Sequence, residues 1–460
     1  MTTARRRLGL ALASVLVVAA ACGGDDDDGT DAGDGNGGDA AGATIDVPDD
    51  HPTIQEAVDA AEPGDLILVA PGVYEEAVDV ETDELTIRGL DRNEVVLDGG
   101  FELDNGIRVA GADGVAVENM TARNYTRNGF FWTEAEGYRG SYLTTYRTGD
   151  YGVYAFDSTK GLIEHSYASG SPDAGFYIGQ CYPCDAVIDQ VVSEYNGLGY
   201  SGTNSGGNLL IVNSTFRNNR AGIVPNSGSY ELCYPERETT IVGNVVHGNN
   251  QPDTPAIEDA LLAMGNGILV AGGVGNTIER NLVYDHDRTG IGVVPYLEDD
   301  PNDDIPPPED DDRPCAETLD ESPADPASIP EPLIWDPRDN RVVGNLVEDS
   351  RLADLAVGAL AEASGLGNCF AENTFATSAP EDLEALAPCE GEGSGDWSVG
   401  ALDLAALIAA EHPPSGDYKT TPVPEPQENM PDAATAPARP ATGMPPAVDL
   451  DAIEVPSKPS

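Results

Sequence analysis

The 460-residue sequence has little positive charge and few of the residues that bind metals or transfer protons near neutral pH. Lysine and arginine number 23 against 81 aspartates and glutamates, which gives a formal net charge of −58 at pH 7. A surface this acidic repels phosphate backbones and anionic lipid headgroups, which argues against binding to nucleic acid. Only five histidines and five methionines occur, without a His/Met cluster. This scarcity argues against a copper site, and we predict no metal site and no cofactor.

The apolar run from Leu8 to Ala21 is too short to span a bilayer stably. Three arginines precede it, so residues 1–21 have the charged and apolar parts of an export signal. The run ends in Ala-Ala-Ala-Cys22-Gly, which resembles the lipobox of bacterial lipoproteins. This resemblance implies lipidation of Cys22 and an exported protein that is held at a bacterial cell membrane by acyl chains alone. Plain secretion is the alternative.

Residues 22–43 and the remaining cysteines are also typical of an exported protein. Gly, Asp and Ala dominate residues 25–43, which cannot bury a core and are predicted to form a flexible acidic linker. Besides Cys22, six cysteines remain, an even number that favours disulfides in an oxidising compartment. Fifteen connectivities are open, and a redox-active or metal-binding CxxC is the alternative. The candidate pairs are Cys181 with Cys184, Cys233 with Cys315, and Cys369 with Cys389.

A glycine followed by a bulky apolar residue recurs along the middle of the chain at intervals of 23 or 24 residues, with one interval of 45. These pairs begin at Gly106, Gly129, Gly152, Gly175, Gly199, Gly222, Gly267 and Gly290. Short β-type segments separated by Gly, Asn and Asp turns at a steady period indicate a solenoid, in which each coil buries its apolar face against its neighbours. The residue after each glycine should point inward and the next one outward.

The segment before these repeats predicts a cap. Thr53 and Glu56 form a capping box, and the apolar residues of 54–61 fall on one helical face, so a short helix should cover the open end of the first coil. Residues 53–89 resemble the N-terminal cap and first coils of right-handed parallel β-helix proteins of the pectate-lyase-like superfamily, and the later coils resemble its NosD-type repeats. The resemblance implies an all-β, single-stranded, right-handed parallel β-helix over residues 44–395.

A polar residue, most often asparagine, recurs between the glycine pairs and predicts a ladder of hydrogen-bonded side chains at one bend of the coils. Its expected members are Asn119, Ser166, Gln190, Ser214, Asn244, Asn281, Asn345 and Asn373. Residues 297–337, with ten prolines and fifteen acids, are predicted to be a disordered insertion that could bind Ca²⁺ only weakly. In residues 396–460 we expect a helix at 401–410 that caps the C-terminal end, followed by a Pro-rich tail.

The outward positions of three consecutive coils place aromatic side chains in one column. The column consists of Phe131, Tyr154 and Tyr177, and the positions three residues further on carry Glu134, Asp157 and Gln180, with Asn204 in the next coil. Pyranose rings stack on aromatic faces while oxygens and amides bind hydroxyls, so these two columns predict a groove for a glycan chain. The alternative is an aromatic ladder that only stabilises the sheet and is covered by another part of the chain.

The resemblance also implies two chemistries. Related lyases use carboxylate-bound Ca²⁺ with an Arg or Lys base, and related epimerases use a Tyr/His/Asp set within an Asp-Pro-His-Asp motif. The nearest match is residues 284–287, in which only His286 and Asp287 fit and which we expect to form a solvated turn. The candidate catalytic residues are Arg127, Tyr154, Asp157, His286 and Asp287.

No complete acid–base set is visible among these residues. We therefore expect an exported, lipid-anchored, monomeric protein that binds a polysaccharide or glycan. A polysaccharide lyase or uronate epimerase is the first alternative, and a purely structural surface protein is the second.

Overall fold

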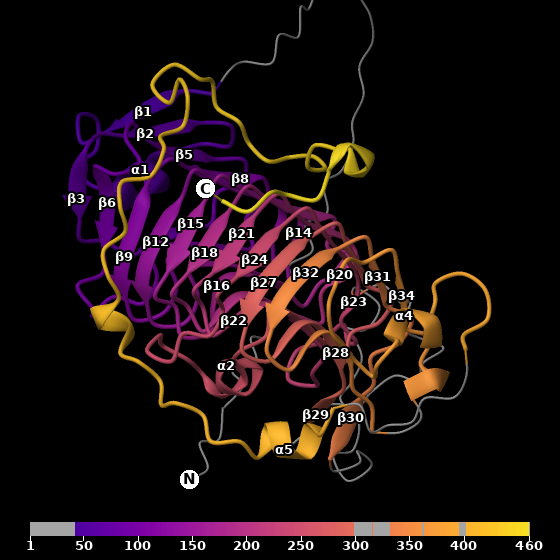
Figure 1. The fold of residues 1–460 in the computed structure, drawn as a ribbon. Coiled ribbons are helices and arrows are strands. Elements are labelled where there is room, and N and C mark those ends of the chain that lie inside the picture. The colour runs from indigo at the N-terminus through magenta and orange to yellow at the C-terminus, as the bar shows by residue number, and fades with distance from the viewer. Residues whose placement is uncertain (1–41, 299–314, 316–331, 361–362, 395–401, 460) are drawn as a thin grey trace, which may run out of the picture. The chain divides into compact units, whose positions relative to one another are not determined.

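The computed structural model describes residues 42–298, 315, 332–360, 363–394 and 402–459. In these residues the strands stack into three long parallel sheets, here named A, B and C, and each coil contributes one strand to each sheet in turn (Figure 1). Sheet A contains β1 (Thr44–Val47), β2 (Leu66–Val69), β5 (Thr86–Gly89), β8 (Val115–Glu118), β11 (Glu136–Ser141), β14 (Thr159–Glu164), β17 (Ala186–Asp189), β20 (Gly206–Val212), β23 (Arg237–Val242), β26 (Thr277–Glu279), β31 (Arg341–Val343) and β34 (Cys369–Ala371). Sheet B contains β3 (Gly72–Tyr74), β6 (Val95–Asp98), β9 (Thr121–Tyr125), β12 (Thr144–Thr148), β15 (Tyr167–Ser169), β18 (Val192–Glu194), β21 (Thr215–Arg217), β24 (Val245–His247), β27 (Leu282–His286) and β32 (Leu346–Ser350).

Sheet C carries the outward columns that the sequence predicts, and the few helices lie outside the coils. Sheet C contains β4 (Val78–Val80), β7 (Ile107–Ala110), β10 (Phe130–Thr133), β13 (Val153–Phe156), β16 (Ala174–Gly179), β19 (Leu198–Thr203), β22 (Ala221–Asn226), β25 (Ile268–Ala271), β28 (Thr289–Val294), β33 (Ala353–Val357) and β35 (Ser378–Ala379). A separate antiparallel hairpin joins β29 (Tyr296–Glu298) to β30 (Leu333–Trp335). The helices are α1 (Ile54–Ala60), α2 (Glu258–Ala263), α4 (Leu383–Leu386) and α5 (Leu404–Ile408), with 3₁₀ turns η3 (Ala363–Gly365), η4 (Tyr418–Thr420) and η5 (Leu450–Ala452).

The repeating glycines mark the start of the sheet C strands, as predicted. The residue after each glycine is buried in the solenoid interior and pairs with its equivalent in the next coil. This inward row is Ile107, Phe130, Val153, Phe176, Tyr200, Ile223, Ile268 and Ile291. A side chain in place of Gly129 would put its Cβ 2.7 Å from the carbonyl oxygen of Gly152. The period therefore requires glycine because the backbones of successive coils approach too closely for a Cβ.

The asparagine ladder is present at the bend between sheets A and B, but two of its expected members are wrong. The backbone N–H of each member donates to the side-chain oxygen of the next at 2.9–3.0 Å, along Ser214, Asn244, Asn281, Asn345 and Asn373. Asn119 and Gln190 have φ of 57° and 55° and lie one residue before the ladder position, which Met120 and Val191 occupy in their coils. In each bend, the first residue adopts the left-handed conformation and the next one points inward into the ladder. The prediction was therefore off by one residue at these two bends.

Two further ladders, which the sequence analysis missed, occupy the other bends. Asn196, Asn219 and Asn249 stack between sheets B and C. Asn276, Asn340 and Asn368 stack between sheets C and A. Each bend exposes backbone groups that strand pairing leaves unsatisfied, and the buried amides supply both a donor and an acceptor there.

Replacing Asn281 by alanine should destabilise the protein strongly. Asn281 is fully buried, its Nδ2 donates to Ile241 O, and its Oδ1 accepts from Asn244 N, so Asn281→Ala leaves both backbone groups without a partner. We expect a loss of about 2–4 kcal/mol in the free energy of unfolding, measured by denaturant titration. The control Asn250→Ala removes an amide from a half-buried loop and should cost less than about 1 kcal/mol. Equal losses would show that burial of the ladder is not what matters.

The predicted N-terminal cap is confirmed, whereas the predicted C-terminal cap is wrong. Thr53 Oγ1 accepts from Glu56 N at 3.1 Å, and Ile54 and Val58 of α1 are buried in the solenoid core. At the other end, α4 covers the last coil, since its Leu383 belongs to the same core. Helix α5, within the segment expected to form the cap, instead packs on the outer face of sheet C. The shorter α4 was not recognised because it has only one fully buried residue.

Residues 411–459, here named the C-terminal strap, run back along the coils and return (Figure 1). Arginines of the solenoid hold it by donating to its backbone carbonyls. Examples are Arg220 to Pro413 and Pro414, Arg147 to Thr421, Arg88 to Ala436 and Pro437, and Arg280 to Leu450. The described part of the predicted Pro-rich tail is thus packed along the surface of the solenoid.

Replacing Arg88 should loosen the strap and destabilise the coils beneath it. Arg88 is fully buried, and its Nε lies 2.6 Å from Glu118 Oε2, so Arg88→Met removes one of the two arginines that neutralise this carboxylate. We expect a loss of about 3–5 kcal/mol in the free energy of unfolding and faster cleavage of the strap by a protease of broad specificity such as proteinase K.

The exposed pair of Arg108 with Asp79, at 3.3 Å, provides the control for this prediction. Arg108→Met should change stability by less than about 1 kcal/mol because solvent screens the pair. If Arg88→Met were as mild as Arg108→Met, the strap would not depend on the buried arginine.

The three cysteine pairs suggested by the sequence form disulfides: Cys181–Cys184, Cys233–Cys315 and Cys369–Cys389. The CxxC is therefore a closed pair. Of the acidic insertion 297–337, the ends form the β29–β30 hairpin, and the rest, apart from Cys315, is outside the described residues. The expected export signal 1–21, Cys22 and nearly all of the linker are outside them as well. Within the described part of the chain, no helix has the length and apolar character needed to cross a membrane.

Candidate functional site

The predicted aromatic column exists, but its ring faces are largely occupied. Phe131 pairs with Tyr154 and Tyr154 with Tyr177 on neighbouring strands, with ring centroids 4.7 and 4.9 Å apart. Tyr151, from the bend before β13, also stacks on Tyr154 at 4.3 Å with the rings nearly parallel. Tyr177 is only 1% exposed. The column therefore stabilises the outer face of sheet C, and Tyr154 has little free ring face for a sugar.

The predicted polar column lies at the bend between sheets C and A, where Glu134, Asp157, Gln180 and Asn204 all have φ near +50°. Glu134 is exposed and Asp157 is half-buried. The two amides are buried and hold the loop 227–236 that follows β22. Gln180 Oε1 accepts from Leu232 N at 2.9 Å, and Asn204 Nδ2 donates to the carbonyls of Gly228 and Glu231. Gln180 and Asn204 thus position a loop and are not free to bind a glycan.

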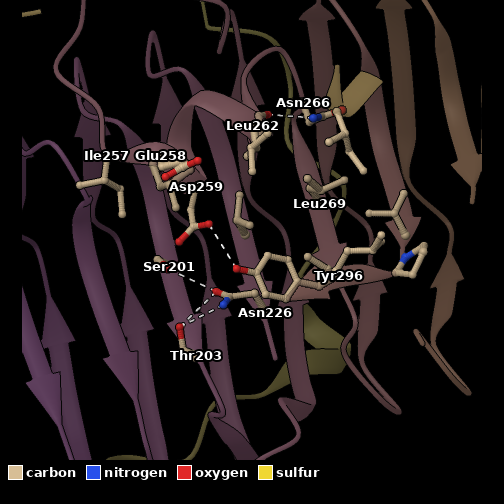
Figure 2. Close-up of a pocket in the computed structure, with 18 of the residues that line it drawn as sticks. Ser201, Thr203, Asn226, Ile257, Glu258, Asp259, Leu262, Asn266, Leu269 and Tyr296 are labelled. Carbon is tan, nitrogen blue, oxygen red and sulfur yellow. Dashed lines mark hydrogen bonds between the residues drawn. The ribbon is translucent and has the colours of Figure 1, made fainter. Parts of the chain in front are cut away.

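Beside this column, a cleft of about 540 Å³ opens on the outer face of sheet C (Figure 2). Its floor is the outward row that continues from Tyr177 along the next coils: Ser201, Val224 and Leu269. Its walls are loop 227–236, helix α2, the start of the β29–β30 hairpin and helix α5. Helix α2 packs through Ala260 and Ala263 on the apolar residues of the floor. The cleft thus lies where two insertions and the C-terminal segment meet on one sheet.

Polar groups converge on one side of the floor. Asn226 Nδ2 donates to Tyr230 Oη at 2.7 Å and to Thr203 Oγ1 at 3.1 Å. In Figure 2, Asp259 points from α2 toward Tyr296, whose hydroxyl donates to Asp259 Oδ1 at 3.3 Å. These hydroxyl and amide groups have spare hydrogen-bonding capacity, so the cleft offers both donors and acceptors to a ligand.

Acidic side chains that the sequence analysis missed line the same side of the cleft. Asp173 follows β15, Glu231 lies in loop 227–236, and Glu258 and Asp259 begin α2. Burial raises the pKa of Asp173 to about 7, and the nearby Asp259 and Asp150 act in the same direction. Burial likewise raises the pKa of Glu231 to about 8, with a further contribution from Asp173. These carboxyl groups carry protons near neutral pH, unlike solvated surface acids.

The described residues provide little positive charge to the cleft. Arg288 is the one cationic side chain that lines it there, and its guanidinium donates to the carbonyls of Leu262 and Leu407. No group of three or more His, Cys, Asp or Glu side chains in the described chain is arranged to hold a metal ion. Among the residues that the structure describes, the acids therefore face the cleft without a basic partner.

The candidate catalytic residues do not assemble into one site. Arg127 is 65% exposed at the bend between sheets B and C, where it pairs with Asp150 at 3.5 Å. Asp157 lies at the opposite edge of sheet C, where burial raises the pKa of its carboxyl, with Glu134 adding to the effect. Tyr154 lies between these edges, and burial raises its pKa well above the usual value. A tyrosine with a raised pKa is a poor base near neutral pH.

His286 and Asp287 are not part of the cleft, and the prediction that residues 284–287 form a solvated turn is wrong. Residues 282–286 are strand β27 of sheet B, because a run of β-forming residues continues the pairing between β24 and β32. His286 is 1% exposed, and its Nε2 lies 3.3 Å from Asn249 Nδ2, at the end of an interior asparagine ladder. Asp287 is exposed and pairs with Arg351 at 3.1 Å.

Acid should destabilise the protein through His286. Burial, with a smaller effect of His247, lowers the pKa of His286 to about 3, whereas in the unfolded chain it is near 6.5. Between these values the unfolded state binds more protons, so this contribution to stability is complete above pH 6.5 and is lost as the pH falls towards 3. The variant His286→Asn should lose less stability than the wild type between pH 6.5 and 4.5, as measured by denaturant titration.

His165→Asn, at a half-buried bend, serves as the control for this prediction. It should keep the pH dependence of the wild type. If His286→Asn lost as much stability as the wild type between pH 6.5 and 4.5, the acid sensitivity would not come from His286.

Comparisons with known proteins agree with this fold. Residues 105–296 match the family model described as "Right handed beta helix region". This part of the chain is a right-handed β-helix. The three sheets extend the same winding beyond both ends of the match. The fold implied by the resemblance to pectate-lyase-like proteins is thus confirmed. No curated protein matches the chain in sequence.

Several solved structures align with the chain at low identity. The A-module of mannuronan C-5 epimerase AlgE4 from Azotobacter vinelandii aligns with a TM-score of 0.44 and 15% identity, over 70% of this chain and 90% of its own. Pectate lyase Pel9A aligns with a TM-score of 0.43 and 12% identity, over 82% of this chain and 84% of its own. A rhamnogalacturonan lyase aligns with a TM-score of 0.44 and 11% identity, over 83% and 92% respectively.

Proposed function

We propose that the protein is exported, is anchored to the bacterial cell membrane through lipidated Cys22, and binds an extracellular carbohydrate chain in the cleft on sheet C. Three disulfides support export, because such bonds persist in oxidising compartments. The observation that carries the binding role is the cleft itself, in which apolar floor residues lie beside convergent hydroxyl, amide and carboxyl groups. The expected monomer and the membrane contact through acyl chains alone remain part of the proposal.

The chemistry of the cleft matches that of a sugar. A pyranose presents apolar C–H faces and hydroxyls that both donate and accept hydrogen bonds. Val224 and Leu269 offer apolar surface, Asn226 and Thr203 offer amide and hydroxyl groups, and the carboxyls can act as donors when protonated. A volume of about 540 Å³ is typical of a ligand site and admits a short segment of a glycan.

A polysaccharide lyase or epimerase is the second candidate, and one feature favours it. Asp173 and Glu231, with raised pKa values, could serve as proton donors near neutral pH. Both reactions also need a base beside the donor. Burial raises the pKa of Tyr151 and Tyr177 well above 10, and Arg288 is bound to two carbonyls, so we rank binding ahead of catalysis.

Filling the cleft should abolish glycan binding. Leu269 is half-buried in the floor, so the larger side chain of Leu269→Trp would occupy the space of the ligand. We expect at least a tenfold loss of affinity for any glycan that the wild type binds on an array, measured by calorimetry. Phe131→Leu, which alters the aromatic column outside the cleft, should bind within about twofold of the wild type.

The outcomes of this experiment separate the alternatives. Loss of binding in Phe131→Leu but not in Leu269→Trp would move the site to the aromatic column. Release of unsaturated uronate from a polysaccharide panel, abolished in Leu269→Trp, would show a lyase in the same cleft. If the wild type neither binds nor modifies any glycan, the proposed function fails.

A further inference from the structure

We infer that the ligand group held at the side of the cleft formed by Asp173, Glu231 and Asp259 is a protonated amine, so that the bound glycan contains amino sugars. This inference rests on the proposed function for the sugar part of the ligand. The amine site itself follows from the charges and contacts of the cleft.

The carboxyl groups on this side of the cleft have no described basic side chain beside them. Three different elements bring carboxyl groups to this side of the cleft: the bend before β16, loop 227–236 and helix α2. The cation that lines the cleft in the described chain, Arg288, donates to the carbonyls of Leu262 and Leu407 and reaches none of these acids through a described hydrogen bond. Carboxyl groups removed from water need a positive partner or a proton. A cationic ligand supplies that partner, whereas a uronate would add to the repulsion.

One carboxyl oxygen of Glu231 has no hydrogen-bond partner. Tyr177 donates to Glu231 Oε1 at 2.5 Å, which fixes the orientation of this carboxyl group. The other oxygen, Oε2, is buried and has no hydrogen-bond partner. Buried carboxyl oxygens normally have partners, so Oε2 is satisfied either by a proton on the carboxyl group or by a donor from outside the chain. An ammonium group offers three donors, enough for more than one acceptor.

Aromatic side chains surround the acids of the cleft. Tyr151 and Tyr177 pack in the aromatic column, so the ring that can face a cation here is that of Tyr230, which lines the cleft and is 42% exposed. Aromatic faces attract cations most strongly when water is excluded. The hydroxyl of Tyr230 accepts from Asn226, which holds the ring at the mouth of the cleft.

Proton binding by the acids of the cleft is consistent with this assignment. Asp173 faces Asp150, Tyr151 and Asp259, and Glu231 faces Tyr177 and Asp173. Asp259 faces Glu258, Tyr296 and Glu298. Burial raises the pKa of each of the three carboxyl groups, the neighbouring acids add to this effect, and the hydrogen bonds from the tyrosines oppose it. An ammonium group favours the ionised carboxylates, so an amine that stays protonated over this range, such as 1,6-diaminohexane, should release protons on binding and bind more tightly as the pH rises from 5.5 to 7.5.

The test compares two oligosaccharides of equal length by calorimetry on the full-length protein. The β-1,4-linked glucosamine tetramer carries amines, and its N-acetylated counterpart does not. We expect the amine form to bind at least tenfold more tightly at pH 6, where its amines are largely protonated, with heats that depend on the ionisation enthalpy of the buffer. Glu231→Gln keeps an acceptor for Tyr177, and Asp259→Asn keeps one for Tyr296, so either variant should fold.

Each variant should lose at least tenfold in affinity for the amine form and stay within about threefold for the acetylated form. The control Glu134→Gln removes an exposed acid at the edge of sheet C and should change neither affinity. Equal binding of the two tetramers would overturn the amine inference and leave carbohydrate binding intact. Binding of 1,6-diaminohexane, weakened in Glu231→Gln, without binding of any glycan would support the amine site and overturn the proposed function. Binding of none of these probes would overturn both.

Discussion

Parallel hydrogen bonds join each coil to the next, with about 23 residues per coil. This pairing determines where nearly every side chain lies. One coil cannot bury its apolar residues alone, so Phe130, Val153 and Phe176 form a core only when neighbouring strands pair in register. The same register leaves only the bends free to accept additional residues. The pairing of Ile223 with Ile268 persists although loop 227–236 and helix α2 are inserted between them. The cleft is therefore built on a sheet whose geometry the insertions do not disturb.

The parts of the fold that repeat were predictable from the sequence because a single physical requirement recurs in every coil. The glycine period, the inward row and the outward column all follow from close backbone approach and strand alternation. The disulfide pairs were also suggested by their spacing. Predictions failed more easily where a shift of one residue along the chain changes the position that a residue takes in the bend. Gln190 shows this error in the ladder, where the bend places one residue outside and the next inside.

His286 illustrates a second limit of sequence patterns. Its neighbours Asp285 and Asp287 suggest a solvated turn, yet the chain buries the imidazole at the end of an asparagine ladder. A neutral imidazole can serve there because its ring nitrogens can accept or donate as the amides do. The cleft was missed for a related reason. Its lining comes from loop 227–236, α2, the β29–β30 hairpin and α5, none of which repeats. The one available signal was the interval of 45 residues between Gly222 and Gly267, which marks the coil that carries two of these walls.

The acidic composition of the chain does not by itself account for the cleft. A net charge of −58 can be carried by carboxylates in water, where each is fully hydrated and costs little. Asp173 and Glu231 differ because burial raises their pKa values to about 7 and 8. Holding such groups without a basic partner costs stability, and apolar residues of similar size would avoid that cost. Local choices that oppose stability concentrate at functional sites. The half-buried acids of the cleft therefore point to a ligand more directly than does the aromatic column, whose stacked rings already satisfy one another.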